Sequence, residues 1–137
     1  MNNTFTKQER LKSQILIDKL FAGGNASMAV FPLRVVYMPV EKVRGEEGAA
    51  LPPVSILVAV PKKRFRHAVD RNRMKRLVRE AYRLNKHILW DALADRDMRL
   101  VLGFVCITDT LPSFRAVNKS MVKMLNRIVE RMKGLPV

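Results

Sequence analysis

The sequence lacks features that disulfide-bonded, membrane-spanning and secreted proteins and many enzymes require. One cysteine, Cys106, in 137 residues excludes an internal disulfide and fits a reducing compartment. The two histidines, His67 and His87, lie beside basic residues and have no carboxylate or cysteine at motif spacing. The longest apolar stretch is interrupted by Pro52 and Pro53, so no segment is long enough to cross a bilayer, and the N-terminus lacks a signal-peptide core. These absences predict a cytoplasmic protein that does not associate with membranes.

Acidic residues are also scarce. Twelve Asp and Glu stand against 26 Lys and Arg, which gives a net charge of +14 and a pI near 10.8. A metal-dependent nuclease needs clustered carboxylates to hold its ions, and the acids here are scattered. Asp91, Asp95 and Asp97 lack any supporting ligand pattern and are interpreted as solvated loop acids. We therefore expect neither catalytic residues nor a metal site in the protein, whose composition is typical of a nucleic-acid binder.

The composition predicts a single globular domain over residues 1–137. The apolar fraction is 48%, and a chain of this length can bury a core without disulfides. Thr4 or Thr6 can cap a first helix that ends near Phe21, with Glu9 placed for a capping box. The glycines at 23 and 24 stop that helix.

Three apolar segments predict strands. They cover residues 31–38, 54–60 and 98–108, and the connection 40–53 can hold a further short strand near 41–44. A basic helix follows the second strand and is expected to continue to Leu89 or Leu93. Ser113 is expected to cap a last helix with an apolar stripe, so the order is α-β-(β)-β-α-β-α, a sheet with helices.

Most of the charge lies in one segment. Residues 62–86 contain eleven Lys and Arg against Asp70 and Glu80, which accounts for +9 of the total charge. At about 100° per residue, one face of this helix is apolar and the opposite face carries a row of cations. The apolar positions are Met74, Leu77, Val78, Ala81, Leu84 and Ile88, and the outward cations are Arg71, Lys75, Arg79, Arg83 and Lys86.

Two other charged residues of this helix are predicted to lie outside the row of cations or to pair with a cation. Arg73 projects near the edge of the apolar stripe, and Glu80 can pair with Arg76 one turn before it. The remaining cations repel one another, which indicates that a polyanion neutralises them and that counterion release drives its binding. The alternative is a solvated basic face that serves solubility.

The pattern Arg71-Asn72-Arg73-x-Lys75-Arg76-x-x-Arg79-Glu80, with Lys62-Lys63 before it, closely resembles the signature of the bacterial ribonuclease P protein component. The order of the other parts agrees, since Arg10-Leu11-Lys12, Phe21, Gly24 and the strand with Tyr37 follow one another as in that family. The resemblance implies an α+β fold, an α/β sandwich in which a mixed sheet packs with three helices, like a ribosomal-protein domain. It also implies a left-handed βαβ crossover, where general rules would give a right-handed one.

The resemblance further implies a function. In that family a small basic protein binds a large catalytic RNA, and this RNA with bound Mg²⁺ removes the 5′ leader of precursor tRNA. The expected partners are therefore the catalytic RNA and precursor tRNA, without DNA, and the protein alone is expected to be inactive. Mg²⁺ is expected to be held mainly by the RNA and the substrate.

The same resemblance assigns two sets of site residues. The cations and amide expected to face RNA are Lys62, Lys63, Arg64, Arg66, Arg71, Asn72, Arg73, Lys75, Arg76, Arg79 and Arg83. A groove between the first helix and the sheet is expected to receive the leader through Arg10, Lys12, Ile17, Phe21 and Tyr37, with aromatic rings stacking on bases. At Ile17 the family often has an aromatic residue, which this chain lacks, and both aromatics can alternatively be core residues.

Two other functions stay open on the sequence. One is a ribosomal or general RNA-binding protein with the same fold and no part in cleavage. The other is an autonomous nuclease. Cleavage of precursor tRNA with and without the RNA subunit distinguishes all three.

Overall fold

The computed structural model describes residues 4–41 and 52–133. Four strands form one sheet in the order β1-β2-β4-β3, and they span β1 (Ala26–Val30), β2 (Leu33–Glu41), β3 (Val54–Ala59) and β4 (Met98–Cys106). Strands β1, β2 and β4 pair antiparallel, whereas β3 pairs parallel with β4. The sheet is therefore mixed, as expected. The possible short strand near 41–44 lies mostly outside the described residues.

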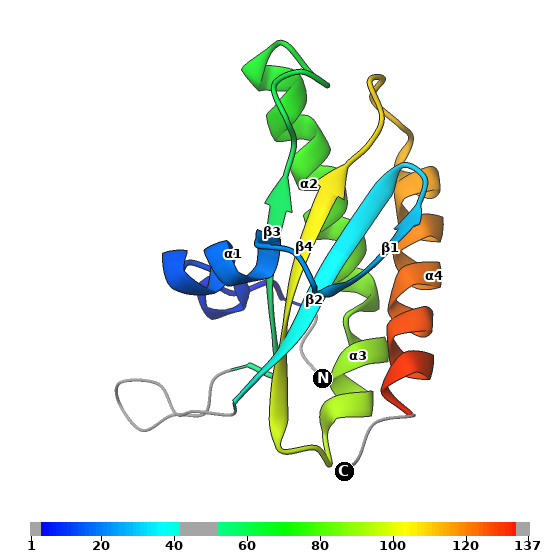
Figure 1. Ribbon diagram of the computed structural model, residues 1–137. Coiled ribbons are helices and arrows are strands. Elements are labelled where there is room, and N and C mark those ends of the chain that lie inside the picture. Colours follow the sequence, from blue (N-terminus) through cyan, green and yellow to red (C-terminus); the bar gives the residue numbers. More distant parts are fainter. Residues whose placement is uncertain (1–3, 42–51, 134–137) are drawn as a thin grey trace.

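Helices cover both faces of this sheet. They span α1 (Gln14–Phe21), α2 (Ala68–Asn85), α3 (His87–Leu93) and α4 (Phe114–Met132), and a single 3-10 turn, η1, covers Lys7–Glu9. In Figure 1, α2, α3 and α4 form a layer behind the sheet and α1 crosses its front. The arrows of β3 and β4 point the same way, and α2 connects them behind the sheet while the chain advances from left to right. This crossover is left-handed, as the family resemblance implied.

Strand alternation assigns each face its own apolar cluster. Leu33, Val35 and Tyr37 are buried on the side of α2, α3 and α4, while Arg34 is exposed and Val36 half-buried on the other side. A smaller cluster beneath α1 contains Leu11, Leu20, Met38 and Val101. The two-residue period of β2 therefore decides which side chains can reach α1.

The first helix is shorter than predicted. The Ser13 hydroxyl accepts a hydrogen bond from the Leu16 amide at 3.3 Å and starts the helix at Gln14. Glu9 does accept from the Thr6 amide at 2.6 Å, but it caps only the 3-10 turn. Between the two, the Leu11 amide donates to the Ile56 carbonyl of β3 at 2.8 Å. This pairing holds the chain extended along the edge of β3, where the sequence predicted helix.

The basic helix also differs from its prediction. It ends at Asn85 and the chain turns at Lys86 into α3, so one predicted helix is two. Lys86 is 2% exposed and forms an ion pair with Glu9 at 2.7 Å, so its prediction as an outward cation was wrong. Tyr82 is fully buried, whereas Leu84, predicted in the apolar stripe, is 38% exposed.

The last helix agrees with its prediction. The Ser113 hydroxyl accepts from the Ala116 amide at 3.1 Å and caps α4. The predicted stripe packs against the sheet and α2 through five fully buried side chains, Val117, Met121, Met124, Leu125 and Ile128. Asn118 also accepts a hydrogen bond from Asn85 at 2.7 Å and so joins α4 to α2.

Candidate nucleic-acid interface

One groove lies along the outward face of α2. The side chains at positions 72, 76, 79 and 83 recur at helical spacing and so share one face. Arg10 and Phe5 from the N-terminal segment complete a groove of about 460 Å³. Its lining residues are Phe5, Arg10, Asn72, Arg76, Arg79, Glu80 and Arg83.

The groove has more guanidinium groups than carboxylates to neutralise them. The Arg10 guanidinium lies 5.6 Å from the centre of the Phe5 ring. Partial burial, and to a lesser degree the charge of Arg10, lower the pKa of Arg79. Glu80 forms a close ion pair with Arg83, which lowers the pKa of the carboxyl, so its predicted pairing with Arg76 was wrong. Cations held this close to one another favour a bound anion.

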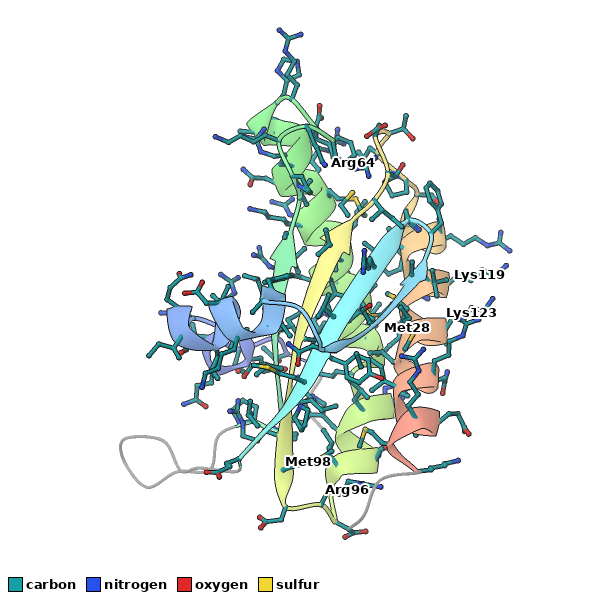
Figure 2. All side chains as sticks on the ribbon, viewed as in Figure 1. Met28, Arg64, Arg96, Met98, Lys119 and Lys123 are labelled. Atoms are coloured by element: carbon teal, nitrogen blue, oxygen red, sulfur yellow. The ribbon has the colours of Figure 1, made fainter. Side chains whose placement is uncertain are left out.

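The segment before α2 carries the other predicted cations. Lys62, Lys63 and Arg66 are exposed in the connection between β3 and α2. Arg64, labelled in Figure 2, forms an ion pair with Asp109 at 3.2 Å. Arg71 donates to the carbonyls of Phe65 and Arg66, each at 2.9 Å, and therefore holds this connection against the start of α2.

The remaining α2 residues agree only in part with the helical phase. Asn72 and Arg76 are exposed in the groove, and Arg73 is exposed but does not line it. Lys75, predicted as an outward cation, is half-buried and does not line the groove either.

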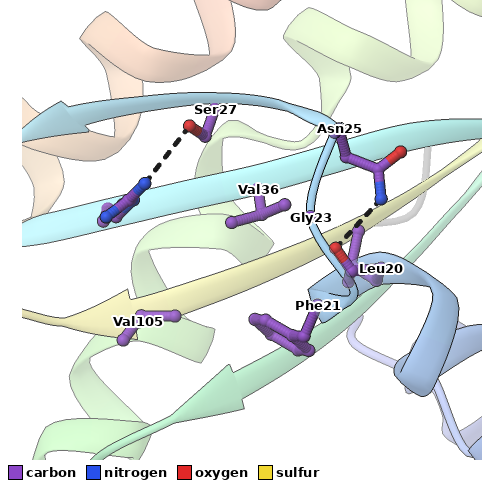
Figure 3. A pocket seen from close by; sticks show the side chains of 9 residues that line it. Leu20, Phe21, Gly23, Asn25, Ser27, Val36 and Val105 are labelled. Atoms are coloured by element: carbon purple, nitrogen blue, oxygen red, sulfur yellow. Dashed lines mark hydrogen bonds between the residues drawn. The ribbon is translucent and has the colours of Figure 1, made fainter.

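A second groove lies between the end of α1 and the front of the sheet. It has a volume of about 470 Å³ and its lining includes Phe21, Arg34, Val36 and Val105 (Figure 3). Phe21 is 43% exposed and presents its ring over β4. A Cβ at Gly103 would lie 2.6 Å from the Phe21 Cζ atom, so glycine is what allows this ring to lie against the strand.

The sequence placed five residues in this groove, and the structure brings only Phe21 there. Tyr37 is 8% exposed on the opposite face of the sheet, where its hydroxyl accepts from Arg131 at 3.3 Å, so its placement was wrong. Ile17 is half-buried in the cluster beneath α1, and Arg10 lies in the α2 groove.

Of two further cations near α1 and β2, one lines this groove and one does not. Lys12 is exposed but does not line it. The groove does contain a cation that the sequence prediction missed, Arg34, although the alternation of β2 places it on this face.

The comparisons with known proteins agree with this geometry. The family model described as ribonuclease P matches residues 5–129. The chain belongs to the ribonuclease P protein family. The ribonuclease P protein component of Porphyromonas gingivalis is 50% identical over 123 residues, covering 90% of this chain and 85% of that one. That of Chlorobaculum tepidum is 36% identical over 143 residues, covering 96% and 90%.

Solved structures of ribonuclease P proteins share the fold. The protein from Thermotoga maritima matches with a TM-score of 0.60 at 21% identity, over 87% of this chain and 96% of that one. The protein from Staphylococcus aureus matches with a TM-score of 0.57 at 17% identity, over 89% and 95%. At these identities the likeness concerns the arrangement of sheet and helices.

Two structural observations concern metal binding and membrane spanning in this ribonuclease P protein. Within residues 4–41 and 52–133, no three His, Cys, Asp or Glu side chains gather as metal ligands. None of the described helices is long and apolar enough to span a membrane.

Proposed function

We propose that this ribonuclease P protein binds the catalytic RNA through the α2 groove and receives the 5′ leader of precursor tRNA in the α1 groove. The observation that carries the proposal is the cluster of Arg10, Arg76 and Arg79, in a groove whose one carboxylate is paired with Arg83. Guanidinium groups bind phosphate oxygens through two parallel hydrogen bonds, and each contact releases condensed counterions. The cation-rich connection at 62–66 extends this surface beyond the start of α2.

The α1 groove fits a single strand better than a duplex. Its half-exposed Phe21 ring can stack on one base, and Arg34 can meet a phosphate nearby. Unpaired bases offer their faces for such stacking, whereas bases inside a helix do not. The leader is the single-stranded part of the substrate, so we assign this groove to it.

Cleavage itself belongs to the RNA in this proposal. The Mg²⁺ ions that the reaction needs are proposed to be held by the RNA and the substrate, since the described residues offer no cluster of carboxylates for them. The contribution of the protein is to neutralise phosphates and to orient the leader. This contribution has its largest effect when Mg²⁺ is scarce and cannot screen the RNA itself.

The test is cleavage of precursor tRNA by the cognate RNA, with and without the protein. We expect the protein alone to be inert and its addition to restore cleavage at low Mg²⁺ and moderate salt. Cleavage by the protein alone would indicate an autonomous nuclease. Cleavage that is indifferent to the protein would indicate a general RNA-binding protein.

A matched pair of variants tests the α2 groove. Arg76→Gln removes a phosphate contact, so the slope of log K against log salt for the catalytic RNA should fall by roughly 0.7 to 0.9. Arg76→Lys keeps the charge, so the slope of log K against log salt should stay the same, although the bidentate hydrogen bonding of the guanidinium is lost. An unchanged slope in Arg76→Gln would remove Arg76 from the RNA contacts.

A further inference from the structure

A second row of cations follows the outward side of α4. Of the 19 residues of this helix, five are Lys or Arg and one, Glu130, is acidic. All five cations recur every fourth residue, but Arg131 donates to the Ser27 carbonyl and the Tyr37 hydroxyl. We call the first four cations the α4 row. Its members are Arg115, Lys119, Lys123 and Arg127, all of them exposed.

No carboxylate of residues 4–41 or 52–133 neutralises the α4 row. Among the described residues, no Asp or Glu lies within ion-pair distance of its four members, and Glu130 pairs with Lys133 at 3.0 Å. Neighbouring cations along the row are roughly 6 Å apart in helix rise. Like charges at this spacing destabilise a helix, so the row is better explained by an external anion than by the stability of α4.

The row turns away from the groove of α2. Lys119 and Lys123 point outward from the sheet on the far side of α4 (Figure 2). In Figure 1, α2 lies behind β3 and β4, and α4 lies behind β1. The two basic surfaces therefore lie at opposite sides of the helical layer, and a single extended strand in the α2 groove would not reach the row.

An exposed aromatic residue lies in a turn that is bonded to α4. Phe31, in the turn between β1 and β2, is 70% exposed. The preceding residue, Val30, accepts a hydrogen bond from Ser120 of α4 at 2.6 Å, so this turn is fixed against α4 at the residue that follows Lys119. Cations that follow a backbone and a ring that stacks on a base are the two parts of a single-strand binding surface.

We infer that the α4 row and Phe31 form a second RNA-binding surface, which holds a single-stranded segment of RNA away from the RNA bound in the α2 groove. The inference shares with the proposed function only the chemical class of the partner. Its position, on the opposite side of the helical layer from α2, implies that the protein joins two separate segments of RNA.

Two matched double variants test the charge. Binding of a labelled single-stranded RNA oligonucleotide is measured between roughly 50 and 200 mM salt. In Lys119→Gln with Lys123→Gln, the slope of log K against log salt should fall by about 1.4. The loss of affinity between these two salt concentrations should therefore be about sevenfold smaller than in the unmodified protein. Lys119→Arg with Lys123→Arg should keep the slope. An unchanged slope in the Gln pair would overturn the inference.

A second pair tests the ring. Phe31→Ala should weaken binding of the same oligonucleotide roughly fivefold or more, and Phe31→Trp should preserve it. Equal binding by Phe31→Ala, or a larger loss for an RNA duplex than for the single strand in the Gln pair, would overturn the assignment to a single strand. Unchanged unfolding midpoints in all four variants would show that the fold is intact.

The outcomes separate this inference from the proposed function. If Arg76→Gln lowers the salt slope and the Gln pair on α4 does not, the inference fails and the proposed function stands. If the Gln pair lowers the slope but the protein does not stimulate cleavage of precursor tRNA, the inference stands and the proposed function fails.

Discussion

The ion pair between Lys86 and Glu9 joins two segments that are far apart in the sequence. Lys86 Nζ lies 2.7 Å from Glu9 Oε1 and 2.7 Å from the Thr4 carbonyl, and 4.5 Å from the centre of the Trp90 ring. The other carboxylate oxygen of Glu9 accepts from the Thr6 amide at 2.6 Å. Both charged side chains are almost fully buried, so each depends on the other to neutralise its charge.

Removal of one partner should therefore be costly. Lys86→Met leaves the Glu9 carboxylate buried without its cation, and such a change costs about 3–5 kcal/mol. This is a large part of the roughly 5–15 kcal/mol by which domains are stable. Replacement of both partners, Lys86→Met with Glu9→Leu, removes both buried charges and should cost much less, about 1 kcal/mol for the Thr6 amide that loses its acceptor.

Urea unfolding followed by circular dichroism measures both effects. With a slope of about 2 kcal/mol per molar urea, Lys86→Met should lower the midpoint by about 2 M, and the double variant should recover most of it. A loss below about 1 kcal/mol in Lys86→Met, or a double variant less stable than the single one, would refute the reasoning. Either result would mean that water reaches the pair and that the N-terminal segment is not anchored by it.

Two further predictions follow from the glycine in β4 and from buried acids. Gly103→Ala displaces the Phe21 ring, because the new Cβ would lie 2.6 Å from its Cζ atom. This variant should weaken binding of a leader oligonucleotide roughly fivefold in a titration. Phe21→Ala, combined with Gly103→Ala, should lower that affinity little further. Burial raises the pKa values of Tyr82 and Cys106 above their ordinary 10.0 and 9.0, so the folded protein keeps protons that the unfolded chain releases, and the urea midpoint should fall as pH rises past these values. A midpoint that stays constant from about pH 8 to about pH 10.5 would contradict this sign.

The long amphipathic helices could be predicted because their signals are local. The cap at Ser113 and the apolar stripe of α4 lie within the helix that they specify, and the structure confirms both. Strand β1 has no such signal, since its five residues, Ala26–Val30, mix small, polar and apolar side chains. It exists because β2 offers it an edge to pair with, from Ala26 opposite Tyr37 to Val30 opposite Leu33.

Lys86 shows why helical phase alone was insufficient at the end of α2. Extension of the helix at 100° per residue places this side chain on the outside. The chain instead turns at that residue, and the partner that makes the turn favourable, Glu9, is 77 residues earlier in the sequence. The start of α1 had a similar cause, because the pairing of Leu11 with Ile56 competes with helix in residues that have helical propensity.

The candidate leader groove shows how backbone alternation decides which aromatic side chains are available. Tyr37 shares the parity of Leu33 and Val35 in β2 and must lie on their buried face, so the sequence already contained the signal that excludes it. Phe21 is therefore the one aromatic among the described residues that line the groove, and Arg34 supplies its cation. With one ring to stack on, the groove can hold few bases by stacking, and phosphate contacts must provide more of the affinity. Leader binding in this protein should accordingly depend strongly on salt and only weakly on leader sequence.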